Sequence, residues 1–397
     1  MLTIRKKEAG FASALTIVLL LIAGMAPGQG KTKDSASLVI DTDIFQDASR
    51  HWYGIADKDN MINARSNQPR YKASQLVEVA DNILLYQKDN GGWPKNYDML
   101  AILTDAQKDT LRQGKHLTNT TFDNRTTYSH IAALGKVYAA TKTDKYKEGA
   151  LKGLDFILAA QYANGGWPQY YPLENNYSRC ITFNDDAMTG IMWLLKDIGE
   201  HKPTYDFVDD QRRKQLEAAY NKGLDCILKM QINDAGKPTA WCQQYDEKTL
   251  QPAWARKFEP PGICNGESVE IVSLLMSIRQ PSAAIKAAVE NAVEWFNASK
   301  ITGIRVKTIA APEMATPFRV SKTDRVVISD STAPPIWTRY YELKTHRPVF
   351  CNRDSKLVYS LAEVARERRD GYGWYTYGPQ KILDGYAAWQ KKWVAVN

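Results

Sequence analysis

Two short segments of the chain share a pattern of polar residues that could bind a metal ion. Residues 121–124 read TFDN and residues 182–185 read TFND, and each segment comes directly before a predicted helix. Asp and Asn are preferred at helix N-caps, which alone explains one polar residue at each helix start. Carboxylate and amide oxygens are also the ligands that Ca²⁺ prefers, because this cation accepts irregular geometry and water as further ligands. The spacing leaves helix capping and a calcium site both open.

Two arginines lie in loops of unusual composition. Arg256 is part of WARKFEPPG (254–262), where two prolines prevent regular backbone hydrogen bonding, and Arg339 is part of PIWTRYYE at a predicted helix start. Surface ion pairs could explain both residues. A cation at a helix N-terminus opposes the helix dipole, however, and needs a compensating partner. A carboxylate-bearing ligand would supply one, because guanidinium binds a carboxylate through two parallel hydrogen bonds.

The pentapeptide NGGWP occurs twice and places Trp93 and Trp167 beside glycine turns. Packing in the core would explain either tryptophan. A tryptophan next to a turn at an open rim can also stack on the face of a sugar, so we treat Trp93 and Trp167 as candidate substrate-binding residues.

Motifs of several other enzyme classes are missing from the sequence. It contains no GxSxG, HExxH, P-loop or dinucleotide-binding pattern, and its five histidines show no helical ligand spacing. A carboxylate pair for glycoside hydrolysis remains possible, because Asp123, Asp185, Asp186 and Glu267 are all candidates.

An internal repeat is expected to position these residues. Residues 82–97 and 156–171 are similar, with Trp93 and Trp167 74 residues apart, and LDFIL at 154 recurs as LDCIL at 224. A fainter fourth copy starts at 292. Each copy combines an amphipathic helix, a loop rich in Gly, Asn and Pro, and a second apolar helix.

This repeat predicts an all-α fold. Two-helix units that bury their faces against their neighbours form a solenoid or a closed ring, and the long aromatic loops favour an α/α toroid. Loops that join first to second helices would all converge on one rim. Strand signals are sparse, and RVVIS at 325–329 is the best candidate.

Several motifs of the chain together resemble those of a known family. The chain resembles the polysaccharide lyase family 10 pectate lyases over about residues 50–390, through motifs that occur in order. These are NGGWPKNYDM, TFDNRTTYSHI, NGGWPQYYP, ITFNDDAM, TAWCQQYDEKTLQPAWARKFEPPGICNGESV, PIWTRYYEL and RPVFCNRD. The resemblance implies an α/α toroid, secretion, and calcium-dependent β-elimination on polygalacturonate.

The resemblance also implies roles for individual residues. By position, Asp123 and Asn124 match the family's calcium and substrate pair, and Asp185 matches its second acidic site. Asp186 adjoins Asp185, so a shift of one residue would exchange them. Arg256 matches the catalytic arginine, which would act as the base, and Arg339 matches a substrate-binding arginine.

The sequence leaves two other functions open. One is a glycoside hydrolase on the same toroid that uses two carboxylates and no metal. The other is a catalytically silent pectin-binding protein of a secreted uptake system.

The N-terminus predicts export. Three basic residues at 5–7 precede an apolar run from Phe11 to about Ala26, the arrangement of a signal peptide. The run is too short for a retained membrane anchor, and Pro27-Gly28 ends it. We therefore predict a signal peptide at 1–28, a flexible segment at 29–46 and one catalytic domain at 47–397, secreted or periplasmic.

Charge and cysteines agree with a secreted protein that acts on an acidic polymer. Without residues 1–28, which hold three basic residues and one acidic residue, the net charge falls from +8 to +6. A basic excess suits a polyanionic partner, although it also serves solubility. The sequence has no block of basic residues and no zinc-ligand spacing, so nothing in it indicates nucleic-acid binding. We expect a monomer. Five cysteines without a close pair favour buried free thiols over a disulfide framework.

Overall fold

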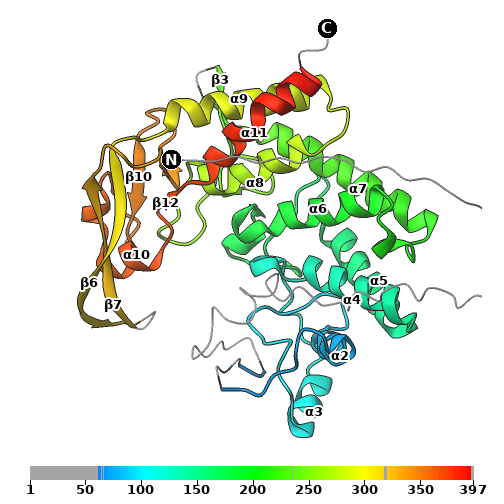
Figure 1. Cartoon of the computed structure of the whole chain (residues 1–397). Helices are drawn as coiled ribbons and strands as arrows, with labels where there is room; N and C mark the ends of the chain where they lie inside the picture. Colours follow the sequence, from blue (N-terminus) through cyan, green and yellow to red (C-terminus); the bar gives the residue numbers. More distant parts are fainter. Residues whose placement is uncertain (1–60, 64, 66, 235, 317–319, 395–397) are drawn as a thin grey trace, which may run out of the picture. The chain divides into compact units, whose positions relative to one another are not determined.

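The computed structural model describes residues 61–394 except 64, 66, 235 and 317–319 (Figure 1). All of them belong to one unit of the chain. The predicted signal peptide at 1–28, the segment at 29–46 and the start of the predicted catalytic domain lie outside the described residues. Within those residues, no helix combines the length and apolar character needed to cross a membrane.

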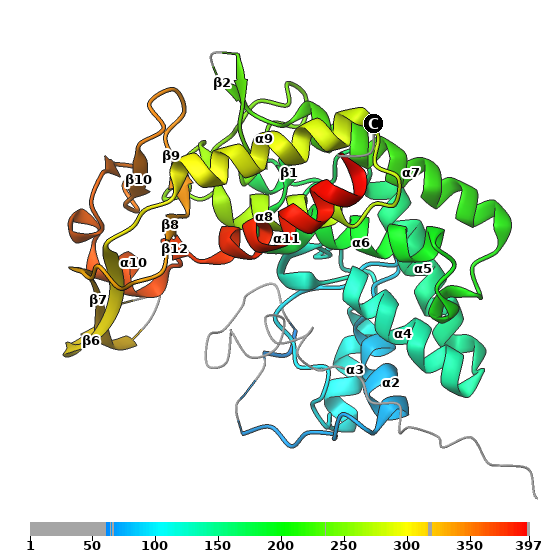
Figure 2. The same ribbon diagram turned by 45° about the horizontal axis from the view of Figure 1, so that its top comes forward.

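Helices in two layers form the larger part of this unit, as the two views show (Figures 1 and 2). The first layer holds helices that precede a tryptophan loop: α2 (Leu76–Tyr86), α5 (Asp144–Ala160), α7 (Asp210–Lys229) and α9 (Ala283–Ser299). The second layer holds helices that follow such a loop: α4 (Tyr128–Thr141), α6 (Ala187–Gly199), α8 (Asn265–Met276) and α11 (Gly378–Trp393). Helices α4 and α5, α6 and α7, and α8 and α9 pack against each other as consecutive pairs. The shorter helices are α3 (Asp105–Gln113), α10 (Arg366–Gly371), η2 (Asp123–Arg125), η3 (Tyr177–Arg179), η4 (Asn184–Asp186), η5 (Pro203–Tyr205) and η6 (Leu361–Glu363).

Local signals in the sequence explain where several helices begin. Thr104 and Gln107 form a capping box at α3, and the Asp209 side chain accepts from the backbone N–H of Arg212 at α7. These contacts satisfy donors that a helix start leaves without an intrahelical partner. Along α9, buried residues recur every three or four positions, which gives the helix one apolar face toward the core.

Four buried tryptophans mark the four copies of the repeat. In each copy the indole N–H donates to a backbone carbonyl of the preceding first-layer helix. The pairs are Trp93 with Ile83 (2.7 Å), Trp167 with Ile157 (2.9 Å), Trp241 with Ile227 (2.8 Å) and Trp337 with Phe296 (2.8 Å). The same contact therefore fixes each loop to its own helix.

A glutamine links each first-layer helix to the next. The side-chain amides of Gln87, Gln161 and Gln231 donate to the carbonyl oxygens of Gly149 (2.9 Å), Ala219 (2.8 Å) and Ala288 (2.9 Å). Each bond joins consecutive copies, so the repeats are stacked in a fixed register.

A β-rich section interrupts the fourth copy between α9 and α11. The longest strands, β6 (Ile304–Ala315) and β7 (Val320–Ser329), form an antiparallel hairpin in which Thr308 lies opposite Arg325. A four-stranded sheet has the order β11 (Leu357–Val358), β10 (Pro348–Cys351), β9 (Tyr340–Tyr341) and β5 (Ile263–Cys264). The remaining pairs are β8 (Trp337–Thr338) with β12 (Tyr375–Thr376), β1 (Ile181–Thr182) with β4 (Gln244–Tyr245), and β2 (Asn233–Asp234) with β3 (Lys237–Pro238).

The β-rich section has its own core. Its buried residues include Phe258, Tyr340, Phe350, Tyr372 and Trp374, which pack separately from the main helical core. The rings of Tyr372 and Trp374 meet edge to face with centroids 4.8 Å apart. This aromatic cluster fixes the segment on which part of the candidate site rests.

The predicted all-α toroid is therefore wrong, because the protein is a mixed fold of 46% helix and 16% strand. The segment RVVIS is part of β7, and its partner β6 carries the β-branched and alternating residues that suit a half-buried strand. The predicted helix start at Arg339 is also wrong, since this residue lies between β8 and β9. Helical periodicity in the four copies did not reveal the insertion within the last one.

All five cysteines are buried free thiols, which confirms the expectation from their spacing.

Candidate active site

Two turns of the same shape carry the candidate acidic residues. Turns η2 and η4 both hold a pair of residues in the left-handed region, Asn124 and Arg125 (φ 51° and 59°) and Asp185 and Asp186 (φ 51° and 58°). Asn and Asp tolerate this conformation, whereas an arginine there is strained. The two sequence segments thus adopt one backbone conformation, as their similarity suggests.

Backbone hydrogen bonds place the two turns side by side. The N–H of Phe122 donates to the carbonyl of Gln169 (3.0 Å), and the N–H of Phe183 donates to that of Gln243 (2.9 Å). Each turn is thereby bonded to the loop of the following copy. Stacking of the repeats then brings the side chains of Asp123 and Asp185 together.

Asp123 is a buried carboxylate with two polar partners. It accepts hydrogen bonds from the Lys95 ammonium and from Gln169 Nε2 (2.9 Å), and it is 3% exposed. Burial alone would raise the pKa of Asp123, but the charge and hydrogen bond of Lys95 hold that pKa below its ordinary value. Asp123 is therefore ionised and partly neutralised by Lys95.

Asp185 experiences the opposite electrostatic effect. Its side chain reaches solvent, yet protein surrounds it densely and Asp123 is its neighbour. Desolvation and the negative charge of Asp123 raise the pKa of Asp185, while Arg339 and Arg256 oppose this increase. A pair of carboxylates in this arrangement is stabilised by an added cation.

Arg256 is held by a buried glutamate three residues later. Its Nε and Nη2 donate to Glu259 Oε2 (2.8 Å) and Oε1 (2.6 Å), and its backbone N–H donates to Oε2 (3.0 Å). Glu259 is 2% exposed and also accepts from the Tyr372 hydroxyl (2.9 Å). Burial would lower the pKa of Arg256, but the hydrogen bonds and charge of Glu259 raise it above its ordinary value.

Arg339 lies on the other side of Tyr372. Its guanidinium donates to Glu267, to Asn184 Oδ1 (2.9 Å) and to Gln243 Oε1 (3.3 Å), and it stacks 4.7 Å from the centre of the Tyr372 ring. Burial would lower its pKa, but the negative charge of Glu267 raises that pKa well above its ordinary value. The guanidinium is a permanent, fixed positive charge.

The structure brings four predicted residues into one electrostatic cluster. Asp185 interacts with Asp123, Arg256 and Arg339. Asp186 instead pairs with Arg125 at 3.2 Å, so Asp185 and not its neighbour belongs to the cluster. Asn124 is buried beside Asp123 and donates to Asn96 (3.3 Å), and its substrate-binding role stays a prediction.

Comparisons with known proteins assign the chain to a family. The model of a family described as pectic acid lyase matches residues 87–383. The chain belongs to the pectic acid lyase family. Two solved structures of a family 10 polysaccharide lyase from Cellvibrio cellulosa are similar, each with 29% identity and a TM-score of 0.66. Each match covers 79% of this chain and 92% of the other, and one of these structures is a mutant in complex with trigalacturonic acid. No curated protein matches the chain.

The family match identifies the protein as a lyase. This result favours elimination over the two alternatives that the sequence left open, the glycoside hydrolase and the silent binding protein. Glu267, one of the carboxylates considered for hydrolysis, forms an ion pair with Arg339 and holds that arginine in place.

Asp123 and Asp185 are the residues of this pectic acid lyase that could contribute oxygen ligands to a calcium ion. Across the described part of the chain, no group of three or more His, Cys, Asp or Glu residues could hold a metal. Asp123 and Asp185 are two adjacent carboxylates, whereas calcium takes six to eight oxygen ligands. The residues therefore fit the cation only when water and a carboxylate ligand complete its coordination.

The predicted stacking of Trp93 and Trp167 on substrate needs correction. Both side chains are 0% exposed, and both indoles are anchored to helix carbonyls. Neither ring has a face open to a sugar. They serve the core of the pectic acid lyase fold, which was the other explanation for the repeated NGGWP.

Four residues of the site were not assigned a supporting role from the sequence: Lys95, Glu259, Glu267 and Tyr372. Lys95 follows NGGWP directly, and Glu259 lies three residues after Arg256, so local spacing could have indicated both. Tyr372 comes from a distant segment, and its position depends on the β-rich section that the sequence did not predict.

Proposed function

We propose that this protein is an exported, calcium-dependent pectate lyase that cleaves polygalacturonate by β-elimination. The observation that carries the proposal is the contact of Asp185 with Asp123, within reach of the charges of Arg256 and Arg339, in a member of the pectic acid lyase family. The complex of the Cellvibrio cellulosa relative with trigalacturonic acid supports the class of substrate.

The reaction requires neutralisation of a carboxylate. The hydrogen on the carbon next to a uronate carboxylate is weakly acidic while that carboxylate keeps its full charge. A calcium ion bound by Asp123 and Asp185 would supply Lewis-acid stabilisation of the negative charge that grows on the substrate. The half-buried Lys95 donates to Asp123 and keeps it ionised for this purpose.

Arg339 is proposed to orient the uronate carboxylate. Glu267, Asn184 and Gln243 hold the guanidinium from one side, and the Tyr372 ring supports it from another. A charge fixed in this way needs little reorganisation when substrate binds, so it contributes orientation and transition-state stabilisation.

Arg256 is proposed to take the proton. As the carbon–hydrogen bond breaks, its electron pair forms the new double bond. The glycosidic carbon–oxygen bond breaks at the same time, its electron pair stays on the leaving oxygen, and that oxygen takes up a proton from water. Glu259 opposes this role, because its charge stabilises the protonated arginine. Positive charge nearby acts in the other direction: Arg353 and Arg368 lie 4.9 and 4.5 Å from the ring centre of Phe258, which Arg256 also contacts at 4.9 Å. An alkaline optimum follows from this balance, since higher pH increases the deprotonated fraction.

Product absorbance tests the proposed reaction. The purified protein is incubated with polygalacturonate in calcium and then in excess chelator, and the ultraviolet absorbance of an unsaturated uronide is followed. Absorbance that rises only with calcium is the expected result. New reducing ends without absorbance would establish hydrolysis instead, and an equal rise in chelator would remove calcium from the proposal.

Export is tested separately, by N-terminal sequencing of the protein recovered outside the cytoplasm. A mature chain that begins near residue 29 agrees with the proposed signal peptide. Recovery of the complete chain from the cytoplasm would overturn it.

A further inference from the structure

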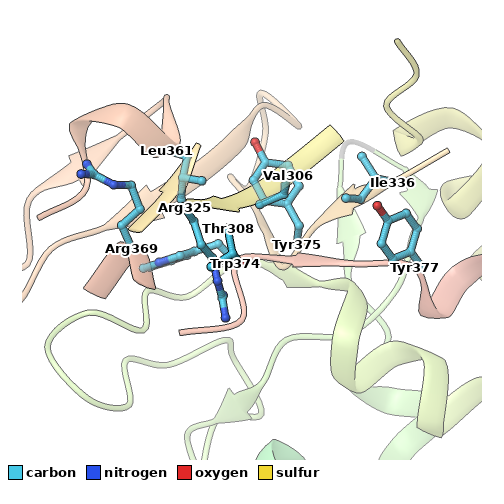
Figure 3. A pocket seen from close by; sticks show the side chains of 9 residues that line it. All are labelled: Val306, Thr308, Arg325, Ile336, Leu361, Arg369, Trp374, Tyr375 and Tyr377. Atoms are coloured by element: carbon cyan, nitrogen blue, oxygen red, sulfur yellow. The ribbon is translucent and has the colours of Figure 1, made fainter. Parts of the chain in front are cut away.

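A pocket outside the candidate active site lies between the β6–β7 hairpin and the segment that leads into α11 (Figure 3). Its volume is about 250 Å³, and its lining includes Val306, Thr308, Arg325, Trp374, Tyr375 and Tyr377. Drug-sized ligands occupy pockets of roughly 300–1,000 Å³, so this pocket has room for a smaller ligand such as one sugar residue.

Two tyrosines give the pocket an amphipathic wall. Tyr377 is 47% exposed and Tyr375 is partly buried, whereas Trp374 is almost completely buried. Figure 3 shows Arg369 at one end of the pocket and Tyr377 at the other, with Arg325, Trp374 and Tyr375 between them. Tyrosine rings with an exposed edge and a hydroxyl are suited to the mixed polar and apolar surface of a sugar.

The two arginines of the pocket differ in what they can still bind. Arg369 is committed, because Nε and Nη2 donate to both oxygens of Asp324 (2.8 and 2.6 Å) and Nη1 donates to two backbone carbonyls. Arg325 spends one guanidinium donor on the carbonyl of Tyr372 (2.8 Å), and within the described residues it makes no ion pair. Its remaining donors can bind a carboxylate, for which the planar guanidinium is well matched.

The pocket and the candidate active site share one segment of the chain. Arg325 binds the backbone of Tyr372, whose hydroxyl contacts Glu259 and Tyr340. The backbone N–H of Arg339 donates to the carbonyl of Trp374 (2.7 Å). A ligand in this pocket would therefore lie against the segment that supports both arginines of the active site.

We propose that this pocket is an accessory binding site for a uronate residue of an acidic polysaccharide, with Arg325 binding the carboxylate and Tyr375 and Tyr377 contacting the sugar. The identity of the ligand rests on the proposed function, because a protein that acts on polygalacturonate meets many uronates on one chain. Binding at two places on the same polymer increases the effective affinity without new contacts in the active site.

Calorimetry with trigalacturonic acid in excess chelator tests this proposal. We expect binding to persist in chelator, and Arg325→Gln to weaken it about ten-fold or more, as expected for loss of a hydrogen bond to a charged group. Lys307→Gln is the matched control. It removes the same charge from the same hairpin, but residue 307 points to the face opposite Val306 and Thr308 and should leave binding unchanged.

A second variant and a neutral ligand keep the test decisive. Because Arg325 supports the Tyr372 backbone, its variant is accepted only if its melting temperature matches that of the Lys307→Gln protein, and Tyr377→Ala should weaken binding independently. Galactotriose, which lacks the carboxylates, should not bind. Equal binding of the neutral sugar, or no effect of Arg325→Gln and Tyr377→Ala, would overturn the accessory site.

The outcome is separable from that of the proposed function. Calcium-dependent formation of unsaturated product without any binding in chelator would refute the accessory site alone. Binding in chelator that depends on Arg325, without unsaturated product under any condition, would refute the proposed reaction and leave the uronate site in place.

Discussion

The acidic and basic residues of the site come from two regions that differ in how they are built. Asp123 and Asp185 lie in turns of equal shape in consecutive repeats, each with two left-handed residues and each bonded to the loop of the following copy. Arg256 and Arg339 lie in loops without such a counterpart, and each is held by its own buried glutamate. Repetition thus supplies two adjacent turns whose carboxylates fall at neighbouring positions, the third residue of TFDN and the fourth of TFND, and departure from the repeat supplies the cations.

The two regions also differ in whether their charges are already compensated within the protein. Asp185 has a raised pKa because desolvation and the negative charge of Asp123 disfavour its ionised form, which a bound cation would stabilise. Arg256 has a raised pKa because Glu259 has already satisfied its charge. Variants in the two regions should therefore respond to different variables, calcium concentration for the turns and pH for the arginines.

The largest effect is expected from Arg256→Ala. Removal of a proton acceptor lowers turnover by about 10²–10⁴-fold, while binding of polygalacturonate persists because Arg339 and the acidic pair remain. The measurement is kcat from product absorbance together with polymer binding by calorimetry. Substantial remaining activity would remove Arg256 from its proposed role.

Arg256→Lys sharpens this result. Lysine keeps the positive charge but loses a proton at lower pH than arginine, so a base at this position should give partial activity with a rate profile displaced to lower pH. A purely electrostatic role predicts reduced activity without that displacement.

Asp185→Asn tests the repeated turns. Loss of one direct carboxylate ligand should weaken calcium activation by at least about 10–100-fold, the range that loss of an outer-shell partner already gives, measured as the calcium concentration at half-maximal rate. Asp186→Asn is the matched control, because this neighbour pairs with Arg125 and lies outside the cluster. An equal effect of the two substitutions would refute the assignment of Asp185.

Glu259→Gln tests the support of the base. Since the Glu259 carboxylate raises the pKa of Arg256, its replacement by a neutral amide should lower that pKa and displace the rising limb of the pH–rate profile to lower pH. Maximal kcat should fall as well, because the bidentate contact that positions the guanidinium is lost. Glu267→Gln, which removes the carboxylate bound to Arg339, should instead raise KM. An unchanged pH–rate profile in the Glu259→Gln variant would contradict the proposed effect of Glu259 on the pKa of Arg256.

The helical repeat and most of the cluster could be predicted from the sequence, for physical reasons. Helical periodicity and the repeated NGGWP segments are local signals, and stacking of equal units then brings equal turns together. Asp123, Asp185, Arg256 and Arg339 were indicated by residue type and by resemblance, and the structure places them together.

What the sequence did not indicate depends on long-range packing. The β-rich section brings Tyr372 to Glu259 across more than one hundred residues, and no local pattern encodes such a contact. The exposure of a tryptophan is equally non-local, because it depends on what the neighbouring copy covers. Local spacing therefore left the environment of Trp93 and Trp167 undecided.

The smallest effect on activity is expected from Trp93→Phe and Trp167→Phe. Each change removes an indole N–H and leaves the carbonyl of Ile83 or Ile157 without this donor, which should cost about 1–3 kcal/mol of unfolding free energy in urea denaturation. KM for polygalacturonate should stay within error of the unmodified protein, since both rings are 0% exposed. Tyr177→Phe is the control for stability. Its exposed side chain lies outside the core and near Arg256, so loss of its hydroxyl should leave the unfolding free energy unchanged. A raised KM with unchanged stability in either tryptophan variant would mean that the indole ring contacts substrate. The proposed difference between repeated residues that form the core and loop residues that bind the polymer would then be wrong.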